Sequence, residues 1–366
     1  MEKKRFMVVS GFLGAGKTTS MIAFSEYIDQ NYGKAAILTN DLGAKNLVDL
    51  EYTSSSSNCC VTPITGDCIC YQTENLVDKL RRLGDIEHAD IVMSDIPGCG
   101  IGALDHVYHK LNNEYTGEFD LAPFVVITDP ERLRMIMPEQ ADINLPEEMR
   151  FLLNSQLKEA DAIVLNKVDL LSENEIQKYL DMLKSTCPET PVFAISAKEK
   201  TNIKEVVDFI MTNRSKLKVV DIGYGGPEFV AAESKLSWYN RNFFVKTQDE
   251  ATFNGNEFVR DYTEKIREKL IANKRNVPHL KVFATAKDGD YNKSSLIGVD
   301  YEILYDRKIK EDFNKLKVIV NARAACESKL LDQIMNEALE EVSNKYNLDC
   351  QVYFTECFGM MDEGRQ

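Results

Sequence analysis

The sequence has no run of about 18 apolar residues, so we expect no transmembrane helix. It also lacks an excess of basic residues, because 44 Lys and Arg face 58 Asp and Glu. The net charge of −14 argues against nucleic acids and anionic membranes as partners. The first residues, MEKKRF, leave no room for a signal peptide before an apolar run, so we expect a cytoplasmic protein.

Residues 6–19, FMVVSGFLGAGKTT, contain a phosphate-binding pattern, G-x-x-x-x-G-K-[ST], between an apolar run and a predicted helix. Its glycines let backbone N–H groups turn toward phosphate oxygens, and the helix N-terminus adds partial positive charge. Lys17 would reach the β- and γ-phosphates, and the Thr18 hydroxyl would bind Mg²⁺. The predicted nucleotide contacts of this loop are Gly11, Gly14, Ala15, Gly16, Lys17, Thr18 and Thr19.

A second motif, N-K-V-D at 166–169, predicts which base is bound. The Asp169 carboxylate can accept hydrogen bonds from guanine N1 and N2, where adenine offers no donors. The stem of Lys167 can lie over the purine, and Asn166 can tie this loop to the phosphate loop. A later strand end offers a backbone N–H for guanine O6, at Ser196, Ala197 and Lys198. We therefore predict that the ligand is GTP.

Two further strand ends carry carboxylates. Asp95, at the end of ADIVMSD, can hold Mg²⁺, and the Gly98 N–H can sense the γ-phosphate, so 96–102 is a predicted switch segment. Asp41 can bind Mg²⁺ or orient the attacking water. The alternatives are a helix cap for Asp95 and a turn residue for Asp41. With Lys17 these are the predicted catalytic residues, and since none must be the base, we expect slow hydrolysis.

The nine cysteines, an odd number without an export signal, predict free thiols or a metal site rather than disulfides. Cys68 and Cys70, on a segment expected to be extended, would face the same way and share a transition metal. Cys99 is the predicted third ligand, although small thiols can also pack as apolar residues. Other candidates for that position are Cys59, Cys60, His106, His109 and a residue of a second subunit, which would imply a GTP-dependent homodimer.

Strand and helix patterns alternate over residues 1–213, which predicts an α/β domain with a mostly parallel, doubly wound sheet. The expected strands are 5–10, 34–39, 90–95, 123–128, 161–166 and 191–196, and the expected helices are 17–30, 72–84, 102–112, 146–159, 173–186 and 202–213. Residues 214–236 are a predicted linker. Residues 237–366 predict a smaller α+β, ferredoxin-like domain, with strands at 237–246, 279–286, 295–305, 315–323 and 350–355 and helices at 255–273 and 326–346.

Residues 5–212 resemble the CobW/HypB/UreG family of P-loop GTPases, in its CobW-like branch. The resemblance is carried by GFLGAGKTT, by ILTNDLG with Asp49 after it, by GDCICY, by QLKEADAIVLNKVDL and by the S-A-K strand end. It implies a GTPase that delivers metal to enzymes or helps to load and repair cobalamin cofactors, with Cys68 and Cys70 as metal ligands. The chain departs from the family's G-C-x-C-C at Asp67 and Tyr71, and it has only four histidines.

Together these features predict a cytoplasmic, Mg²⁺-dependent GTPase that couples its nucleotide state to delivery of Zn²⁺, Co²⁺, Ni²⁺ or a metallocofactor. The client would be a metalloenzyme or a corrinoid protein. One alternative is a nucleotide-gated interaction switch that carries no metal and uses its cysteines structurally. Another is a small-molecule kinase on a P-loop scaffold, which the N-K-x-D motif argues against.

Overall fold

The computed structural model describes residues 3–43, 48–98, 100–137, 146–248 and 251–359. Internal contacts divide the chain into two compact units. The first unit contains the described residues of 1–44, 53–143 and 147–229, and the second contains those of 45–52, 144–146 and 230–366. No helix within these described ranges is long and apolar enough to cross a membrane.

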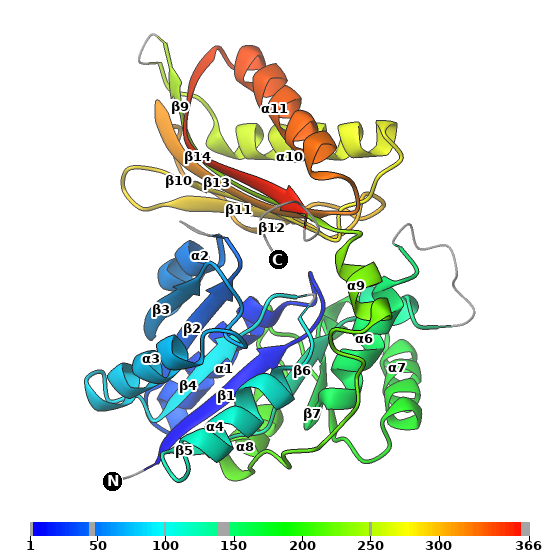
Figure 1. Cartoon of the computed structure of the whole chain (residues 1–366). Coiled ribbons are helices and arrows are strands. Elements are labelled where there is room, and N and C mark those ends of the chain that lie inside the picture. The colour runs from blue at the N-terminus through cyan, green and yellow to red at the C-terminus, as the bar shows by residue number, and fades with distance from the viewer. Residues whose placement is uncertain (1–2, 44–47, 99, 138–145, 249–250, 360–366) are drawn as a thin grey trace. The chain divides into compact units, whose positions relative to one another are not determined.

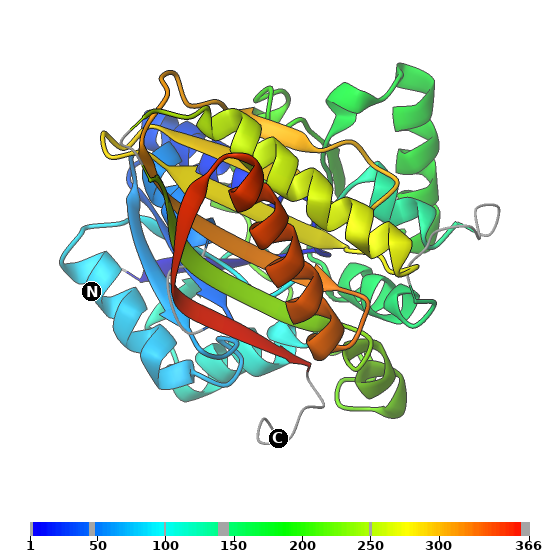
Figure 2. The ribbon, with the colours of Figure 1, turned by 90° about the horizontal axis from the view of Figure 1, so that it is seen from above.

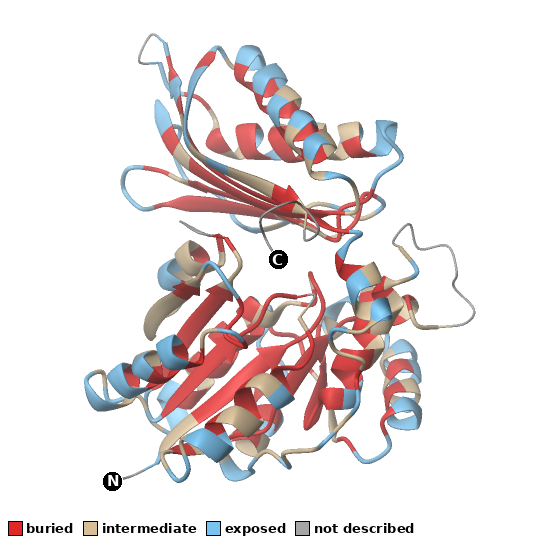
Figure 3. Ribbon diagram, viewed as in Figure 1, coloured by how far each residue is buried: buried red, intermediate tan, exposed pale blue. Residues whose placement is uncertain are grey.

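The first unit is built on one parallel sheet, in the order β3-β2-β4-β1-β6-β7-β8, with β5 paired to β1 (Figure 1). Its central strands are buried over most of their length, because helices cover both faces, whereas the edge strands β3 and β8 are largely half-buried (Figure 3). The predicted doubly wound α/β fold is therefore confirmed. The strands are β1 Lys4–Ser10, β2 Ala35–Asp41, β3 Cys60–Thr65, β4 Ile91–Asp95, β5 Phe119–Leu121, β6 Val125–Thr128, β7 Ala162–Leu165 and β8 Val192–Ala194.

The helices of the first unit, and α2, whose residues divide between the two units, include some that the sequence patterns did not predict. Short helices α2 and α5 and strands β3 and β5 lie outside the predicted elements, and the helix expected at 102–112 begins as a π-helix, η1. The helices are α1 Lys17–Asn31, α2 Val48–Ser56, α3 Thr73–Asp85, η1 Leu104–His109, α4 Lys110–Glu114, α5 Pro130–Arg134, α6 Met149–Glu159, the 3₁₀ turn η2 Val168–Leu170, α7 Glu173–Thr186 and α8 Ile203–Thr212.

The second unit is an antiparallel sheet in the order β12-β11-β10-β13-β9-β14, with both long helices on one face (Figure 2). The order β14-β9-β13-β10 is the predicted ferredoxin-like arrangement, and the β11–β12 hairpin extends it at one edge. The strand expected at 295–305 was wrong, because a turn separates β11 from β12. The elements are α9 Pro227–Glu233, which begins before the boundary, then β9 Ser237–Thr247, α10 Gly255–Ala272, β10 His279–Thr285, β11 Tyr291–Leu296, β12 Leu304–Arg307, β13 Lys315–Ala324, α11 Ser328–Lys345 and β14 Leu348–Gly359.

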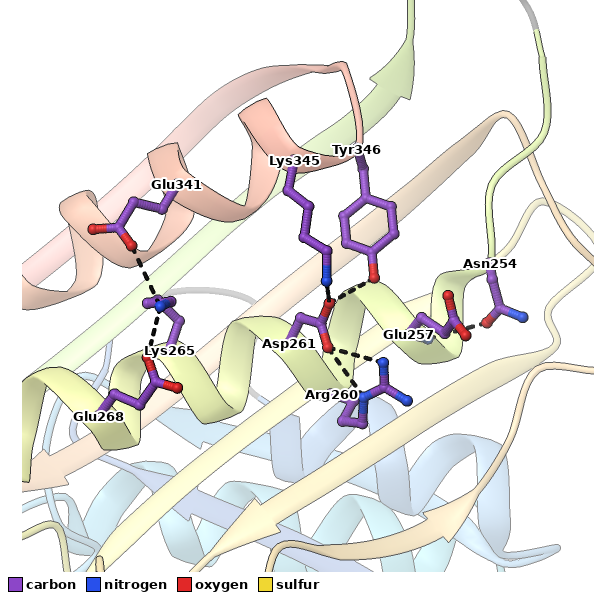
Figure 4. A network of polar contacts seen from close by, with 9 residues as sticks. All are labelled: Asn254, Glu257, Arg260, Asp261, Lys265, Glu268, Glu341, Lys345 and Tyr346. Carbon is purple, nitrogen blue, oxygen red and sulfur yellow. Dashed lines mark hydrogen bonds and ion pairs between the residues drawn. The ribbon is translucent and has the colours of Figure 1, made fainter.

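Polar contacts fasten α10 to α11 on the outer side of this layer (Figure 4). Asp261 accepts hydrogen bonds from the Lys345 ammonium and, at 2.7 Å, from the Tyr346 hydroxyl. Lys265 pairs with Glu341 at 3.5 Å. Burial opposes ionisation of Asp261, but its hydrogen bonds lower its pKa. These contacts fix the register of the two helices over an apolar core.

Residues 48–52, the described part of 45–52, lie between β2 and β3 in the sequence but group with the second unit. The Asp49 carboxylate accepts a hydrogen bond from Lys281 Nζ at 2.6 Å, and Glu51 accepts one from Lys317 Nζ at 2.8 Å. Burial opposes ionisation of Asp49, but the Lys281 ammonium lowers its pKa well below the ordinary value. The acidic side of α2 is therefore matched to basic side chains of β10 and β13.

Candidate nucleotide and metal site

The phosphate-binding loop connects β1 to α1 at the carboxyl edge of the sheet, where ligands bind in doubly wound folds. Gly16 has a φ of +97°, and a Cβ there would lie 2.3 Å from the Asn166 side-chain nitrogen. Only glycine satisfies both the left-handed backbone and this close approach. Lys17 Nζ donates a hydrogen bond to the Gly11 carbonyl at 2.7 Å, which places the ammonium inside the loop.

Asn166 joins three loops of the site. Its Nδ2 donates to the Ala15 carbonyl at 3.0 Å, and its Oδ1 accepts from the Ala197 N–H at 3.0 Å. The side chain is buried, so these bonds are shielded from water. The structure thus brings the phosphate loop, the N-K-V-D turn and the S-A-K strand end together, with Ser196 buried and Lys198 exposed.

Lys167 follows with a left-handed backbone, φ +64°, which is uncommon for a residue with a side chain. Its ammonium donates to the Gly14 carbonyl at 2.7 Å and pairs with Asp129. Because the Lys167 ammonium is held at Gly14, its aliphatic stem lies along the phosphate loop. Asp169 lies on η2 and is exposed at the same edge, so its carboxylate can reach a ligand.

Asp129 is a site residue that the sequence analysis missed. It ends β6 and caps α5, where its Oδ1 accepts from the Arg132 N–H at 2.8 Å. Burial opposes ionisation, but the Lys167 ammonium and the Arg132 guanidinium hold the pKa of Asp129 below its ordinary value. The signal in the sequence was an aspartate at a strand end followed by Pro130, a favoured first helical residue.

Thr18, Asp41 and Asp95 supply hydroxyl and carboxylate oxygens from α1, β2 and β4 at the carboxyl edge. Oxygen donors of this kind suit Mg²⁺, so the residues fit the predicted cation. Thr18 and Asp95 are buried and Asp41 is half-buried. The Asn40 N–H donates to Asp95 Oδ1 at 2.8 Å, which ties the end of β2 to that carboxylate.

The side chain of Asn40 points the other way, to the turn that carries the paired cysteines. Its Nδ2 donates to the Asp67 carbonyl at 2.8 Å, and its Oδ1 accepts from the Ile69 N–H at 3.0 Å. Asn40 is buried, and the sequence analysis did not select it. One residue therefore contacts both the Asp95 carboxylate and the turn around Cys68.

Cys68 and Cys70 are both buried, on tight turns rather than on the extended segment that we predicted. The Cys70 N–H donates to Cys68 Sγ at 3.4 Å, and the Tyr71 N–H donates to the Cys68 carbonyl at 3.0 Å. The hydrogen bond with Cys68, burial, and the charges of Cys68 and Glu159 raise the pKa of Cys70 well above its ordinary value. The turn brings the thiols together, as the alternation of an extended strand would also have done.

The other proposed transition-metal ligands do not gather around this pair. Cys60 begins β3 and so lies at its opposite end from the Cys68 turn, with Cys59 just before it. His109 Nε2 contacts the Lys218 carbonyl at 3.0 Å, and His106 lies against the Tyr224 ring. Among the residues that the structure describes, no three His, Cys, Asp or Glu side chains form a metal cluster, and Cys99 lies outside them.

The segment after Asp95 lies against the phosphate loop. A Cβ on Gly98 would come within 2.9 Å of the Leu13 backbone nitrogen, so the two backbones are in close contact. Gln156 and Glu159 of α6 hydrogen-bond to this segment and to the residues that follow it. Burial raises the pKa of Glu159 to about 7, although its two backbone N–H donors oppose the shift.

The first unit matches a family profile. Residues 5–194 match the nucleotide-binding domain of CobW/HypB/UreG proteins, which is more than half of the chain. A zinc-regulated GTPase metalloprotein activator 1 from Dictyostelium discoideum is 24% identical over 240 residues, covering 57% of this chain and 48% of that protein. This chain therefore spans about half the length of that relative.

Two solved structures show weak overall similarity. HypB from Helicobacter pylori in complex with nickel is 18% identical, with a TM-score of 0.39, covering 56% of this chain and 85% of that one. Zn(II)-bound YjiA GTPase from E. coli is 15% identical, with a TM-score of 0.35, covering 93% of this chain and 99% of that one.

Replacing Asp129 by Asn should destabilise the protein by roughly 3 kcal/mol near neutral pH, because Lys167 would lose its buried counter-charge. The pKa of Asp129 is lowered in the folded protein, so the carboxylate stabilises it above about pH 4 and this contribution is lost as the pH falls. Denaturant unfolding at several pH values should show the difference between wild type and D129N shrinking toward acid. Exposed Asp181→Asn is the control, and a difference that persists unchanged below pH 4 contradicts the pairing.

Proposed function

Because this chain belongs to the CobW/HypB/UreG family and is a GTPase, we propose that it couples its nucleotide cycle to delivery of a metal ion or metallocofactor. The observation that carries this proposal is Asn40. Its backbone N–H contacts Asp95, and its side chain holds the turn of Cys68 and Cys70. A movement of Asp95 can therefore reach the thiols through one residue, since the backbone and the side chain of Asn40 each form a hydrogen bond, one to Asp95 and the other to the cysteine turn.

For the nucleotide, the exposed Asp169 carboxylate would accept from guanine N1 and N2. The Ala197 N–H is already donated to Asn166, which leaves the Lys198 N–H as the donor for guanine O6. Lys17, with the N–H groups at the start of α1, would hold the β- and γ-phosphates. The other phosphate-loop residues proposed to contact the nucleotide are Gly11, Gly14, Ala15, Gly16 and Thr19.

Thr18, Asp41 and Asp95 would hold Mg²⁺, which when bound neutralises negative charge on the phosphates. Asp41 Oδ1 accepts from the Gly43 N–H at 3.1 Å, which orients the carboxylate at the end of β2. From there Asp41 can position the attacking water. Gly98, held against Leu13, would present its N–H to the γ-phosphate. GDP has no γ-phosphate, so this contact would form with GTP and not with GDP.

For the cargo, Cys68 and Cys70 would supply two thiolates to Zn²⁺, Co²⁺ or Ni²⁺, each losing its proton as the metal binds. The similar protein from Dictyostelium discoideum is a zinc-regulated GTPase metalloprotein activator, which supports a metal of this class. The remaining ligand would come from Cys99, from a second copy in a GTP-dependent homodimer or from the client. The client would be either a corrinoid protein or a metalloenzyme.

A switch without metal cargo is the second candidate function. The observation in its favour is that no three His, Cys, Asp or Glu side chains of the described residues form a metal site. In that case Cys68 and Cys70 are structural, and client activation depends on the nucleotide alone. The linkage experiment below separates the two functions.

Replacing Asp169 by Asn should weaken GTP binding by roughly 100-fold or more, because an amide nitrogen would face the donors of guanine. Xanthine carries a carbonyl where guanine has its amino group, so xanthosine triphosphate should bind D169N better than it binds wild type. Calorimetry with both nucleotides measures this exchange. Equal GTP affinities for wild type and D169N contradict the assigned role.

Metal and nucleotide should change each other's affinity by the same factor, on the order of 5- to 150-fold, because linkage is reciprocal. Titrations of Zn²⁺, Co²⁺ and Ni²⁺ with and without a non-hydrolysable GTP analogue measure that factor. Changing Cys68 and Cys70 to Ser should abolish metal binding, whereas exposed Cys350→Ser is the matched control. Client activation that survives in the double variant favours the switch without cargo.

Asn40→Ala should leave both ligands able to bind but reduce their mutual effect to within about twofold, because the side-chain bridge to Asp67 and Ile69 is removed. The same titrations measure it, with exposed Asn75→Ala as the control. A coupling factor in N40A equal to that of wild type would show that the thiols and the nucleotide communicate by another route.

A further inference from the structure

We propose that Gln156 and Glu159 of α6 are positioning residues that hold the described residues of the switch segment, 96–98 and 100–102, in the conformation that accepts GTP. The proposal rests on the proposed binding of GTP and Mg²⁺ at the phosphate loop, and it does not depend on any metal cargo. Neither residue belongs to the phosphate loop or to the N-K-V-D turn. Both nevertheless form hydrogen bonds with the backbone that follows Asp95.

Gln156 acts on the carbonyl groups of this segment. Its Nε2 donates to the Gly98 carbonyl at 3.1 Å and to the Gly100 carbonyl at 3.0 Å. The residue is fully buried, so water does not compete for these bonds. One amide group therefore holds two peptide units on either side of position 99.

Glu159 acts on the N–H groups one step further along. Its carboxylate accepts from the Gly102 N–H at 2.9 Å and from the Leu104 N–H at 3.3 Å. These N–H groups lie at the start of the helix that begins at Leu104, whose own N-cap residue forms no side-chain hydrogen bond. Glu159 of α6 therefore caps this helix. Glu159 is only 2% exposed, so few other groups can replace it.

The two side chains are matched to what they hold. They are three residues apart on α6 and therefore share one face of the helix. The amide donates to carbonyls and the carboxylate accepts from N–H groups, and the peptide units that they hold are at alternate positions, 98, 100, 102 and 104. We call Gln156 and Glu159 together the α6 clamp.

The held conformation is relevant to GTP because it places Gly98 against Leu13 of the phosphate loop. A Gly98 N–H in this position is available to a γ-phosphate, which GDP does not have. If the clamp is lost, the segment spends less time in this position, and the apparent affinity for GTP falls by that fraction. The affinity for GDP does not depend on the same contact.

Gln156 also has an unused atom. Among the residues that the structure describes, its Oε1 has no hydrogen-bond partner, although it is buried. Buried acceptors usually have a partner, so this oxygen is available to an N–H of the switch segment in a second arrangement. The clamp therefore keeps one spare acceptor beside the four hydrogen bonds that it forms in the held conformation.

A purely structural cap would lower stability without changing the choice between GTP and GDP, so the test measures that choice. Calorimetry at about pH 8, above the pKa of Glu159, gives the affinities for Mg²⁺-GDP and for a Mg²⁺-bound, non-hydrolysable GTP analogue. The variants are Glu159→Gln, which loses one acceptor, and Gln156→Asn, which keeps the amide but is one methylene too short. Exposed Glu173→Gln is the control.

We expect each clamp variant to lose roughly tenfold in affinity for the analogue and to stay within about twofold for GDP, since a hydrogen bond to a charged group is at stake in E159Q. Steady-state hydrolysis should show a raised KM for GTP in both. Equal losses for GDP and the analogue, or no loss for either, overturn the clamp. If E159Q does not fold, the affinities of Q156N test the proposal. Hydrogen exchange of the Gly102 amide in wild type gives a second readout. This exchange should slow more with the analogue than with GDP. Wild type that binds no guanine nucleotide contradicts the proposed function instead.

Discussion

The missing side chain at Gly16 is the constraint on which the nucleotide site depends. Because no Cβ is present, the Asn166 amide reaches the Ala15 carbonyl and, from the same position, the Ala197 N–H. Any larger residue would push Asn166 away, and the loops proposed to recognise base and phosphate would separate. The position of the N-K-V-D turn is therefore set from within the phosphate loop, although 151 residues separate Ala15 from Asn166.

Amide side chains hold both the cysteine turn and the segment after Asp95. Asn40 links the end of β2 and Asp95 to the cysteine turn, and Gln156 links α6 to the segment after Asp95. An amide donates and accepts in fixed directions, so each residue can favour one backbone arrangement over another without carrying charge. The proposed coupling of nucleotide state to the cysteine turn depends on these directed contacts.

The nucleotide motifs and the parallel sheet were predictable, because a phosphate loop and a guanine motif each need fixed residue types at fixed spacing. Asp129 was not, since an aspartate at a strand end is also an ordinary helix cap, and only the fold brings Lys167 to it. Strand β3 escaped prediction because Pro63 argues against a strand, yet an edge strand tolerates it. The partners of Gln156 are backbone groups, which leave no pattern in a sequence.

The second unit is discontinuous in the chain, since helix α2 passes out of it between Tyr52 and Thr53. A fragment that starts at the linker would present Lys281 and Lys317 without the acidic groups that pair with them. A fragment that ends there would keep Asp49 and Glu51 but lose their lysines. A cut at the linker therefore does not separate the two units without loss of ion pairs. During synthesis, the peptide that carries Asp49 leaves the ribosome 232 residues before the lysine that pairs with it.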